Sequence, residues 1–409
     1  MNIFVINNGS SSIKYQLFKM PGQQPVCSGL VERISLTDGQ ISHKTFVNGQ
    51  ENQWKETGNI PTHEAGLLRV VALLTTGDHA VIKSPDEIEV VGHRVVHGGE
   101  NFKATTIISD AIKEKIKQLF SLAPLHNPAN YLGIEIAEKI FSGAKQVAVF
   151  DTAFHQSMAA EAFRYAIPKS FYTDHRIRAY GFHGTSHKYV SRQATAFLHK
   201  PDAKLISIHL GNGCSIAAVA AEKSIDTSMG FGPLSGLVMG TRSGDIDGSV
   251  IFHLVNQLGY SLQDVNDLLN KKSGMQGLTG LSDMRDINKA AAEGNEDAVL
   301  AIAMYVYRIK KYIGAYAAVL NGLDAIVFTA GVGENAANIR EAVCSNMQYL
   351  GIHIDGEKNQ QATGALREIN TPTSPVKILV IATNEELEIA RQCYDLMTSE
   401  TKKARTNHP

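Results

Sequence analysis

The sequence predicts an α/β protein with two similar domains, and three observations support this fold class. Short apolar, β-branched runs recur along the chain and end in glycine or polar residues, as buried strands do. Amphipathic stretches lie between them, the clearest over residues 296–320. Two similar Asn-Gly turns lie about half the chain apart. Strands that alternate with helices indicate an α/β architecture, and the repeated turn indicates duplication.

Six apolar runs are expected to form buried strands that deliver polar groups at their ends. They are IFVIN from Ile3, EVVGHRVV from Glu89, VAVFD from Val147, LISIHLG from Leu205, AIVFTAG from Ala325 and ILVIAT from Ile378. In the expected helix, apolar residues recur at steps of three and four, and we interpret the face that they share as core. These residues are Val299, Ile302, Val306, Ile309, Ile313, Tyr316 and Leu320. Residues 399–409 lack periodicity and are expected to form a loose tail.

The two Asn-Gly turns are Asn8-Gly9 in VINNGSSSI and Asn212-Gly213 in SIHLGNGCSI. Between strands, Asn-Gly favours a type I′ turn, in which both central residues have positive φ. We interpret the two turns as one hairpin-led α/β unit that is present twice, with both copies facing a shared cleft. Coincidence is the alternative, because such turns are common in a chain of this length.

Length, composition and charge restrict the functional class. The chain has 409 residues, enough for two domains, with 44 % hydrophobic and 19 % charged residues and a formal net charge of −1. Without a basic stripe, neither nucleic acid nor a membrane surface is expected as a partner. No run approaches the ~18 apolar residues of a membrane span, and the N-terminus lacks a signal-peptide pattern. The cysteines show no CxxC spacing, so reduced thiols and a cytoplasmic location are expected.

The N-terminal run NNGSSSIK combines a tight turn with hydroxyls at Ser10, Ser11 and Ser12 and a cation at Lys14. Backbone amides and hydroxyls in such a turn can bind phosphate oxygens, although a polar hairpin without a ligand has the same composition. The P-loop pattern, GxxxxGK followed by Ser or Thr, is absent, so a phosphate site would be built on hairpins. GVGEN, residues 331–335, fits both a nucleotide-binding turn and a plain strand-to-helix turn.

Charged residues follow the ends of several expected strands. Arg94 in GHRVVHGGE and Arg242 in MGTRSGDIDG carry guanidinium forks that match carboxylate and phosphate, although a single arginine more often forms a structural ion pair. The carboxylates of Asp151, Asp283 and Glu385 suit one or two Mg²⁺ ions. Helix capping is the alternative role for Asp151 and Asp283.

Histidines cluster at His183 and His187 in GFHGTSH, with His126 in APLHNP. The spacing of the first two resembles a metal-binding pair but lacks the glutamate of HExxH. An imidazole near a transferring phosphoryl group could stabilise its charge. For His187 we favour a structural role, because a single helical histidine seldom binds a ligand.

Together these motifs resemble the acetate kinase family in an ordered series from Asn2 to about Leu396. They are NNGSSSIK, GHRVVHGG, APLHNP, VFDTAFH, YGFHGTSH, HLGNGCS, TSMGFGPL, GLVMGTRSGDIDG, SDMRD, TAGVGEN and ATNEE. The resemblance implies duplicated ribonuclease H-like domains of the superfamily that includes acetate kinases, sugar kinases, heat-shock-cognate chaperones and actin. We accordingly expect an N-terminal domain of residues 1–151 with 386–409 and a nucleotide-binding domain of residues 152–385.

The resemblance also implies a reaction and its participants. The γ-phosphoryl group of ATP would pass reversibly to acetate by direct in-line transfer, giving acetyl phosphate and ADP. Mg²⁺, with Mn²⁺ as an alternative, would be the cofactor, and the enzyme would be a homodimer. Arg94 and Arg242 would clamp the carboxylate and the phosphoryl group, His183 would stabilise the transition state, and Asp151 would orient the groups or bridge to the metal.

Further site residues are implied by the same resemblance. The implied metal ligands are Asn7 and Glu385. The pocket for the methyl group would consist of Val96, Leu125, Phe182 and Pro233, with His126 close by. Ser10 and Ser12 would lie at the phosphate end of the first domain. The implied nucleotide contacts are Lys14, His209, Leu210, Gly211, Asn212, Gly213, Asp283, Met284, Arg285, Gly331, Val332, Gly333, Glu334 and Asn335.

Two other functions are compatible with parts of the sequence. A chaperone-like or actin-like ATPase would share the nucleotide motifs but would not need Arg94 and Arg242 around a small apolar pocket. An oxidoreductase would use GVGEN as a dinucleotide turn, but the acidic residue expected after a second strand is missing. The segment GFGPLSG and Met284 depart from the usual family pattern, which leaves the finer shape of the acyl and nucleotide pockets open.

Overall fold

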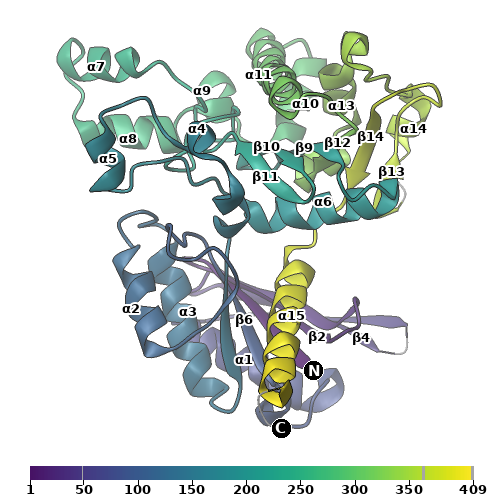
Figure 1. The fold of residues 1–409 in the computed structure, drawn as a ribbon. Coiled ribbons are helices and arrows are strands. Elements are labelled where there is room, and N and C mark those ends of the chain that lie inside the picture. The colour runs from purple at the N-terminus through teal and green to yellow at the C-terminus, as the bar shows by residue number, and fades with distance from the viewer. Residues whose placement is uncertain (48, 362–363, 407–409) are drawn as a thin grey trace. The chain divides into compact units, whose positions relative to one another are not determined.

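The computed structural model describes residues 1–47, 49–361 and 364–406 and divides the chain into two compact units. Unit 1 comprises Met1–Ala153 and the chain from Asn384 onward, and unit 2 comprises Phe154–Thr383 (Figure 1). Within the described part of the chain, no helix has the length and apolar character needed to cross a membrane.

Unit 1 contains an eight-stranded sheet in the order β5-β4-β3-β2-β1-β6-β8-β7. The strands are β1 (Asn2–Asn8), β2 (Ile13–Lys19), β3 (Pro25–Glu32), β4 (Gly39–Val47), β5 (Gln50–Gly58), β6 (Val90–Val95), β7 (Thr106–Ile107) and β8 (Lys145–Phe150). Strands β1 to β5 form an antiparallel meander, whereas β1 pairs in parallel with β6, and β6 with β8. The helices are α1 (His63–Thr75), α2 (Asp110–Gln118), α3 (Asn127–Ile140) and α15 (Glu385–Thr406).

Unit 2 contains a six-stranded sheet in the order β11-β10-β9-β12-β14-β13. The strands are β9 (Lys204–Leu210), β10 (Cys214–Ala220), β11 (Lys223–Thr227), β12 (Ala325–Thr329), β13 (Leu366–Glu368) and β14 (Lys377–Ile381). The helices are α4 (Ala160–Phe163), α5 (Lys169–Thr173), α6 (Gly184–Leu198), α7 (Gly248–Asn256), α8 (Leu262–Lys271), α9 (Gly274–Thr279), α10 (Met284–Ala292), α11 (Glu296–Leu320), α12 (Ala330–Asn335), α13 (Ala337–Cys344) and α14 (Gly356–Gln360).

The two sheets share a five-stranded core. The orders β3-β2-β1-β6-β8 and β11-β10-β9-β12-β14 match, with antiparallel pairing on the hairpin side and parallel pairing on the other side. The β1–β2 and β9–β10 hairpins therefore occupy equivalent places. The predicted α/β class and its duplication are confirmed, and all six predicted runs form strands.

The predicted type I′ turns are wrong. None of Asn8, Gly9, Asn212 and Gly213 has a positive φ. The reason is loop length, because β1 and β2 are joined by residues 9–12 and β9 and β10 by residues 211–213, whereas a type I′ turn joins strands through two residues. The Gly9 amide donates to the Ser12 carbonyl at 2.8 Å, and the Gly211 amide donates to the Gly213 carbonyl at 3.1 Å.

Two helical expectations also need correction. In α11, Val306, Ile309 and Ile313 are buried as predicted, but Val299 is 52 % exposed because Ala298 and Ala301 face the core in that turn. The segment expected to be a loose tail is helical through Thr406, and residues 407–409 lie outside the described residues. A helix that is anchored at its first turns gains one hydrogen bond for each residue added, so weak periodicity does not end it.

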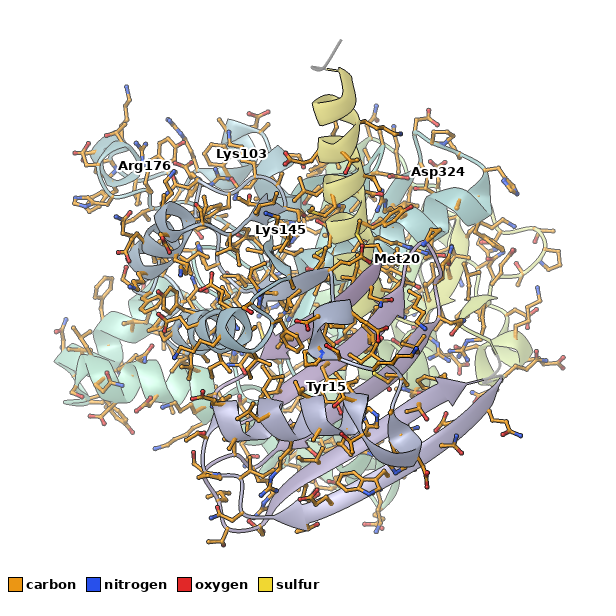
Figure 2. All side chains as sticks on the ribbon, turned by 90° about the horizontal axis from the view of Figure 1, so that it is seen from below. Tyr15, Met20, Lys103, Lys145, Arg176 and Asp324 are labelled. Carbon is orange, nitrogen blue, oxygen red and sulfur yellow. The ribbon has the colours of Figure 1, made fainter. Side chains whose placement is uncertain are left out.

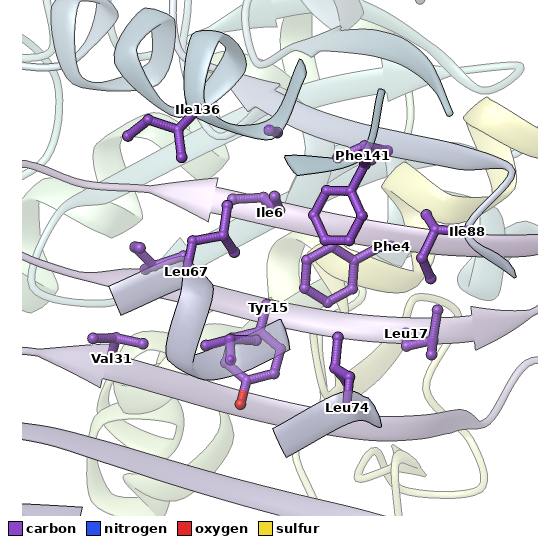
Figure 3. Close-up of a cluster of buried hydrophobic side chains, with 14 of the residues drawn as sticks. Phe4, Ile6, Tyr15, Leu17, Val31, Leu67, Leu74, Ile88, Ile136 and Phe141 are labelled. Carbon is purple, nitrogen blue, oxygen red and sulfur yellow. The ribbon is translucent and has the colours of Figure 1, made fainter. Parts of the chain in front are cut away.

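Each unit buries apolar side chains on its own sheet. In unit 1, Tyr15 of β2 (Figure 2) packs in a cluster with Phe4, Leu67 and Phe141 (Figure 3), and the Phe4 and Phe141 ring centroids lie 5.4 Å apart. In unit 2, every residue of β12 is buried. Continuous burial is typical of a parallel strand that is covered on both faces.

Helix α15 crosses close to strands β1 and β6 of unit 1 (Figure 1). Gly92 of β6 makes this approach feasible, because a Cβ atom there would lie 2.9 Å from the Cys393 Sγ atom and 3.0 Å from the Ile389 Cγ2 atom. The packing brings the first turn of α15 to the ends of the parallel strands.

Replacing Gly92 tests this packing. Gly92→Ala is expected to lower the free energy of unfolding by about 1–3 kcal/mol, because the added methyl group overpacks the contact between β6 and α15. Thermal unfolding followed by circular dichroism measures the change. Gly314→Ala in α11 is the matched control, since no heavy atom there lies within 4 Å of the new methyl group, and it should stabilise by about 0.5–1 kcal/mol through helix propensity. Equal midpoints for Gly92→Ala and wild type would contradict the close approach.

Candidate active site

In unit 1, polar side chains gather where the parallel strands end. Asn7 lies near the end of β1 and Arg94 near the end of β6, and Asp151 directly follows β8. Glu385 begins α15. Because the carboxyl ends of parallel strands meet at one edge of a sheet, these residues come together although they are far apart in the sequence.

Arg94 is the centre of this group. Its Nη2 atom donates a short hydrogen bond to Asp151 Oδ2, and its Nη1 atom donates to Asn7 Oδ1 at 3.4 Å. Its Nε atom lies 3.6 Å from Glu385 Oε2. The Asp151 side chain is only 1 % exposed, so this ion pair is largely removed from water.

Burial and charge shift the ionisation of two of these groups. Burial alone would lower the pKa of Arg94, but the carboxylates of Asp151 and Glu385 outweigh it and raise that pKa, so the guanidinium stays charged. Burial raises the pKa of Glu385 from 4.5 to about 7, and repulsion from Asp151 and Glu386 adds to the effect against the attraction of Arg94 and Lys14. Glu385 therefore exchanges its proton near neutral pH.

Lys14, predicted to contact the nucleotide phosphates, forms an ion pair with Glu386 at 2.8 Å in unit 1. Ser10 and Ser11 are exposed in the loop between β1 and β2.

Val96, predicted to line the methyl pocket, is buried but lies one residue beyond β6. Leu125 is 69 % exposed, and His126 precedes α3.

In unit 2, a cavity of about 670 Å³ lies beside the turn after β9 and helix α12. Of the predicted nucleotide contacts, those that line this cavity are Gly211, Asn212, Asp283, Met284, Arg285, Gly331, Val332 and Asn335. The lining does not include Lys14, His209, Leu210, Gly213, Gly333 or Glu334. GVGEN forms most of the short helix α12 rather than an open turn.

The cavity wall carries an exposed ion pair between Asp283 and Arg285. Asp283 caps α10 by accepting from the Arg285 amide, and it also accepts two further bonds from the guanidinium of Arg285, at 3.0 Å to Nε and 2.6 Å to Nη2. The Arg285 hydrogen bonds hold the pKa of Asp283 at about 2. The capping role considered for Asp283 is therefore present, and it positions Arg285 on the cavity wall.

His183 lies beside the cavity turn and precedes α6 in a left-handed conformation, with φ of 55°. Its ring stacks on His209, with centroids 4.3 Å apart, and its Nδ1 atom is 2.9 Å from Ser215 Oγ. A Cβ atom at Gly213 would lie 3.4 Å from His183 Nε2 and 3.6 Å from Arg242 Nη1. His183 and Arg242 therefore flank the same glycine.

Arg242 differs from Arg94 in its partners. Its Nη1 atom donates to the Pro233 carbonyl at 3.1 Å. Among the described residues of unit 2, no carboxylate forms an ion pair with Arg242, and burial lowers the pKa of its guanidinium. An arginine without a carboxylate partner is available to an anionic ligand.

Residues 2–391 match the model of the acetokinase family. The chain belongs to this family. Among acetokinase relatives, the acetate kinase of Flavobacterium johnsoniae is 58 % identical over 397 residues, covering 97 % of this chain and 100 % of the relative. The acetate kinase of Thermotoga maritima is 50 % identical over 402 residues, covering 97 % and 99 %.

Solved structures agree with this family membership. The acetate kinase of Porphyromonas gingivalis matches with a TM-score of 0.89 and 43 % identity, covering 97 % of this chain and 99 % of that one. A propionate kinase from Francisella tularensis matches with a TM-score of 0.89 and 44 % identity, covering 96 % and 98 %. Acetokinases are kinases, so the two alternative functions, an oxidoreductase and a chaperone-like or actin-like ATPase, are not supported.

Sequence reasoning missed several residues that shape this acetokinase site. Gly240 and Tyr305 line the cavity, together with Met275, Ser282, Asn288, Ala336 and Asn338. Tyr305 was detectable, because it is adjacent to Val306 on the buried face of α11. No sequence pattern indicated a role for Arg340. Its Nη1 atom donates to the carbonyls of Gly333 and Glu334, both at 3.0 Å, and so fixes the end of α12.

Proposed function

We propose that this protein is an acetate kinase, which transfers the γ-phosphoryl group of ATP to acetate and forms acetyl phosphate and ADP. Membership of the acetokinase family over nearly the whole chain carries this proposal. In the reaction, a carboxylate oxygen of acetate attacks the γ-phosphorus, and the bond from phosphorus to the β–γ bridging oxygen breaks. Initial rates of ADP formation with formate, acetate, propionate and butyrate test the substrate class.

The nucleotide is proposed to bind in the cavity of unit 2. Its volume of about 670 Å³ falls within the range of small-molecule sites, and its wall combines apolar Met284 and Val332 with polar Asn212 and Arg285. Gly211, Asn212 and Gly213 form the turn that would face the phosphates. A turn with little side-chain bulk lets backbone amides approach phosphate oxygens.

The two arginines are proposed to act on different groups. Arg94 uses donors on Asp151 and Asn7 but retains others of its five N–H groups for the acetate carboxylate. Arg242 and His183, which flank Gly213, would face the transferring phosphoryl group. Asp151 would orient Arg94. With two donors preorganised at the phosphoryl group, a direct in-line transfer without a phospho-enzyme is the proposed mechanism.

Substitution of the two arginines should have different consequences. Arg242→Ala removes a guanidinium that has no carboxylate partner in its unit, so we expect kcat to fall by roughly 10²–10⁴ while thermal unfolding stays near wild type. Arg94→Ala should also destabilise the protein, because it removes the guanidinium that pairs with buried Asp151. Steady-state kinetics and thermal unfolding of both variants provide the measurement. Near-normal turnover of Arg242→Ala would exclude its proposed role.

Mg²⁺ is proposed to bind at Asn7 and Glu385, with Mn²⁺ as a substitute. The donor set fits, because amide and carboxylate oxygens are hard ligands and both side chains lie at the same guanidinium, at 3.4 Å and 3.6 Å. A cation would also relieve the repulsion that raises the pKa of Glu385. When bound, the metal ion supplies neutralising charge for the phosphate oxygens.

Metal affinity should depend on pH through Glu385. Its folded pKa of about 7 lies above the usual 4.5, so below pH 7 the metal must displace a proton, and above pH 7 it need not. Binding of Mn²⁺, followed by loss of its electron paramagnetic resonance signal, should be about tenfold weaker at pH 6 than at pH 8. Glu385→Gln should bind weakly at both values. Equal affinity of the wild type at pH 6 and pH 8 would refute this assignment.

Acetate is proposed as the preferred acid, and its methyl group is proposed to contact Val96, Leu125, Phe182 and Pro233. A stiff β-branched residue in a small pocket should exclude a further methylene. Such a methylene is worth about 1–3 kcal/mol, so kcat/KM for acetate should exceed that for propionate by roughly 10–200-fold.

Val96→Ala should narrow this preference. The truncation makes room for one methyl group, so kcat/KM for propionate should rise relative to acetate while KM for ATP stays unchanged. Val96 is buried, so some stability will be lost in either case. The decisive quantity is the ratio of kcat/KM for the two acids, and an unchanged ratio would mean that Val96 only packs the core.

A homodimer is proposed through the exposed apolar side chains of the α7–α8 segment. Phe252 is 69 % exposed and Leu262 72 % exposed, and Leu258 between the two helices is also exposed. Large apolar groups that cluster on a surface commonly mark an interface. Sedimentation equilibrium should give twice the chain mass for the wild type and a monomer for a Phe252→Asp and Leu262→Asp double variant. A monomeric wild type would overturn the proposal.

A further inference from the structure

Four side chains of unit 2 form a continuous series of hydrogen bonds, here called the hydrogen-bonded chain, that leads from Ser207 to His183. Ser207 Oγ lies 2.8 Å from His187 Nδ1, His187 Nε2 lies 2.7 Å from Ser215 Oγ, and Ser215 Oγ lies 2.9 Å from His183 Nδ1. Ser207 and Ser215 come from the neighbouring strands β9 and β10, and both histidines come from the start of α6. The structural role favoured for His187 is therefore more specific than core packing.

The side chains of this hydrogen-bonded chain that precede His183 are buried away from water. Ser207, Ser215 and His187 are fully buried. Burial, with the neighbouring imidazoles of His155 and His209, holds the pKa of His187 well below its usual value, so the ring is neutral. A neutral imidazole has one N–H donor and one acceptor nitrogen. The chain can therefore adopt only two arrangements of its protons.

In the first arrangement, each of the three protons that lie between these four side chains has an acceptor. The Ser207 hydroxyl donates to His187 Nδ1, His187 Nε2–H donates to Ser215 Oγ, and the Ser215 hydroxyl donates to His183 Nδ1. His183 then carries its proton on Nε2. Each serine donates one bond, and Ser215 accepts one as well, which matches the capacity of a hydroxyl group.

The second arrangement reverses all these bonds and leaves one proton without an acceptor. His187 Nδ1–H would donate to Ser207 Oγ, so the Ser207 hydroxyl proton would need another partner. Among the residues that the structure describes, His187 is the only side-chain partner of Ser207 Oγ, and no carbonyl accepts from it. A buried donor without an acceptor carries its full desolvation cost, so the first arrangement is favoured.

We propose that Ser215 and His187 are positioning residues that hold His183 in the tautomer with its proton on Nε2. This inference rests on the proposed phosphoryl transfer for its catalytic meaning. His183 Nε2 lies beside Gly213 and near Arg242, so its N–H is a donor at the point where the phosphoryl oxygens would lie. In the other tautomer Nε2 has only a lone pair, which would repel those oxygens. The hydrogen-bonded chain thus supplies a donor at His183 Nε2.

The tautomer can be measured without substrate. In protein labelled with ¹⁵N in its histidine rings, long-range ¹H–¹⁵N correlation spectra distinguish the two tautomers, and the His183 signals are assigned by their absence in His183→Asn. We expect wild-type His183 to carry its proton on Nε2 at pH 8. A proton on Nδ1 in the wild type would overturn the proposal, whatever the variants do.

Variants along the chain test the positioning. Ser215→Ala should convert His183 to a mixture of tautomers and lower kcat roughly 10–10²-fold, with KM for ATP and acetate changed less than about threefold. Ser215→Thr, which keeps the hydroxyl, should restore both. Unchanged tautomer and kcat in Ser215→Ala would refute the proposal.

Ser191→Ala is the matched control. Ser191 is a buried serine one turn beyond His187 on α6, and its hydroxyl belongs to no hydrogen bond of the chain, so its removal should leave the His183 tautomer and kcat unchanged. Failure of the proposed function can be distinguished from failure of the positioning proposal. A wild type without acetate-dependent turnover would refute the kinase activity, whereas the tautomer spectra decide the positioning by themselves.

Discussion

Parallel strand pairing is the constraint on which the rest of the structure depends. In unit 1 it aligns the ends of β1, β6 and β8, and in unit 2 it aligns the ends of β9, β12 and β14. The residues proposed to take part in the reaction lie at or near one of these two sheet edges, where the parallel strands end, or in a loop or helix beside it. Because register is fixed by backbone hydrogen bonds, which pair Val95 with Phe150, the edge places Arg94 against Asp151 although the two residues lie far apart in the sequence.

The two edges have different electrostatic character. In unit 1, the carboxylates of Asp151, Glu385 and Glu386 surround Arg94 and Lys14, and the surplus of negative charge suits a cation. In unit 2, Arg242 has no carboxylate partner within its unit, and the stacked His183 and His209 rings lie near the turn after β9, which suits an anion. One duplicated architecture thus has an edge with surplus negative charge in one copy and, in the other, an edge whose arginine has no carboxylate partner within its unit.

Sequence alone could predict features that depend on local patterns. Continuous apolar runs identified the six central strands, and the repeated Asn-Gly turns identified the duplication, but the turn type depended on loop length and was missed. The pairing of Lys14 with Glu386 was not predictable, because it joins segments distant in sequence. The hydrogen bonds from Arg340 to the carbonyls of Gly333 and Glu334 were not predictable either, because no sequence pattern marks a buried arginine. Val299 was assigned to the core because periodicity cannot tell where a long helix leaves its sheet.

In the proposed reaction, the γ-phosphoryl group passes to a small carboxylate rather than to water. The most direct measurement is the stoichiometry of products when purified protein is incubated with ATP, Mg²⁺ and acetate, with acetyl phosphate trapped by hydroxylamine. We expect equal amounts of ADP and acetyl hydroxamate, and no appreciable ADP when acetate is omitted. Formation of ADP without acetate, or without matching hydroxamate, would contradict it.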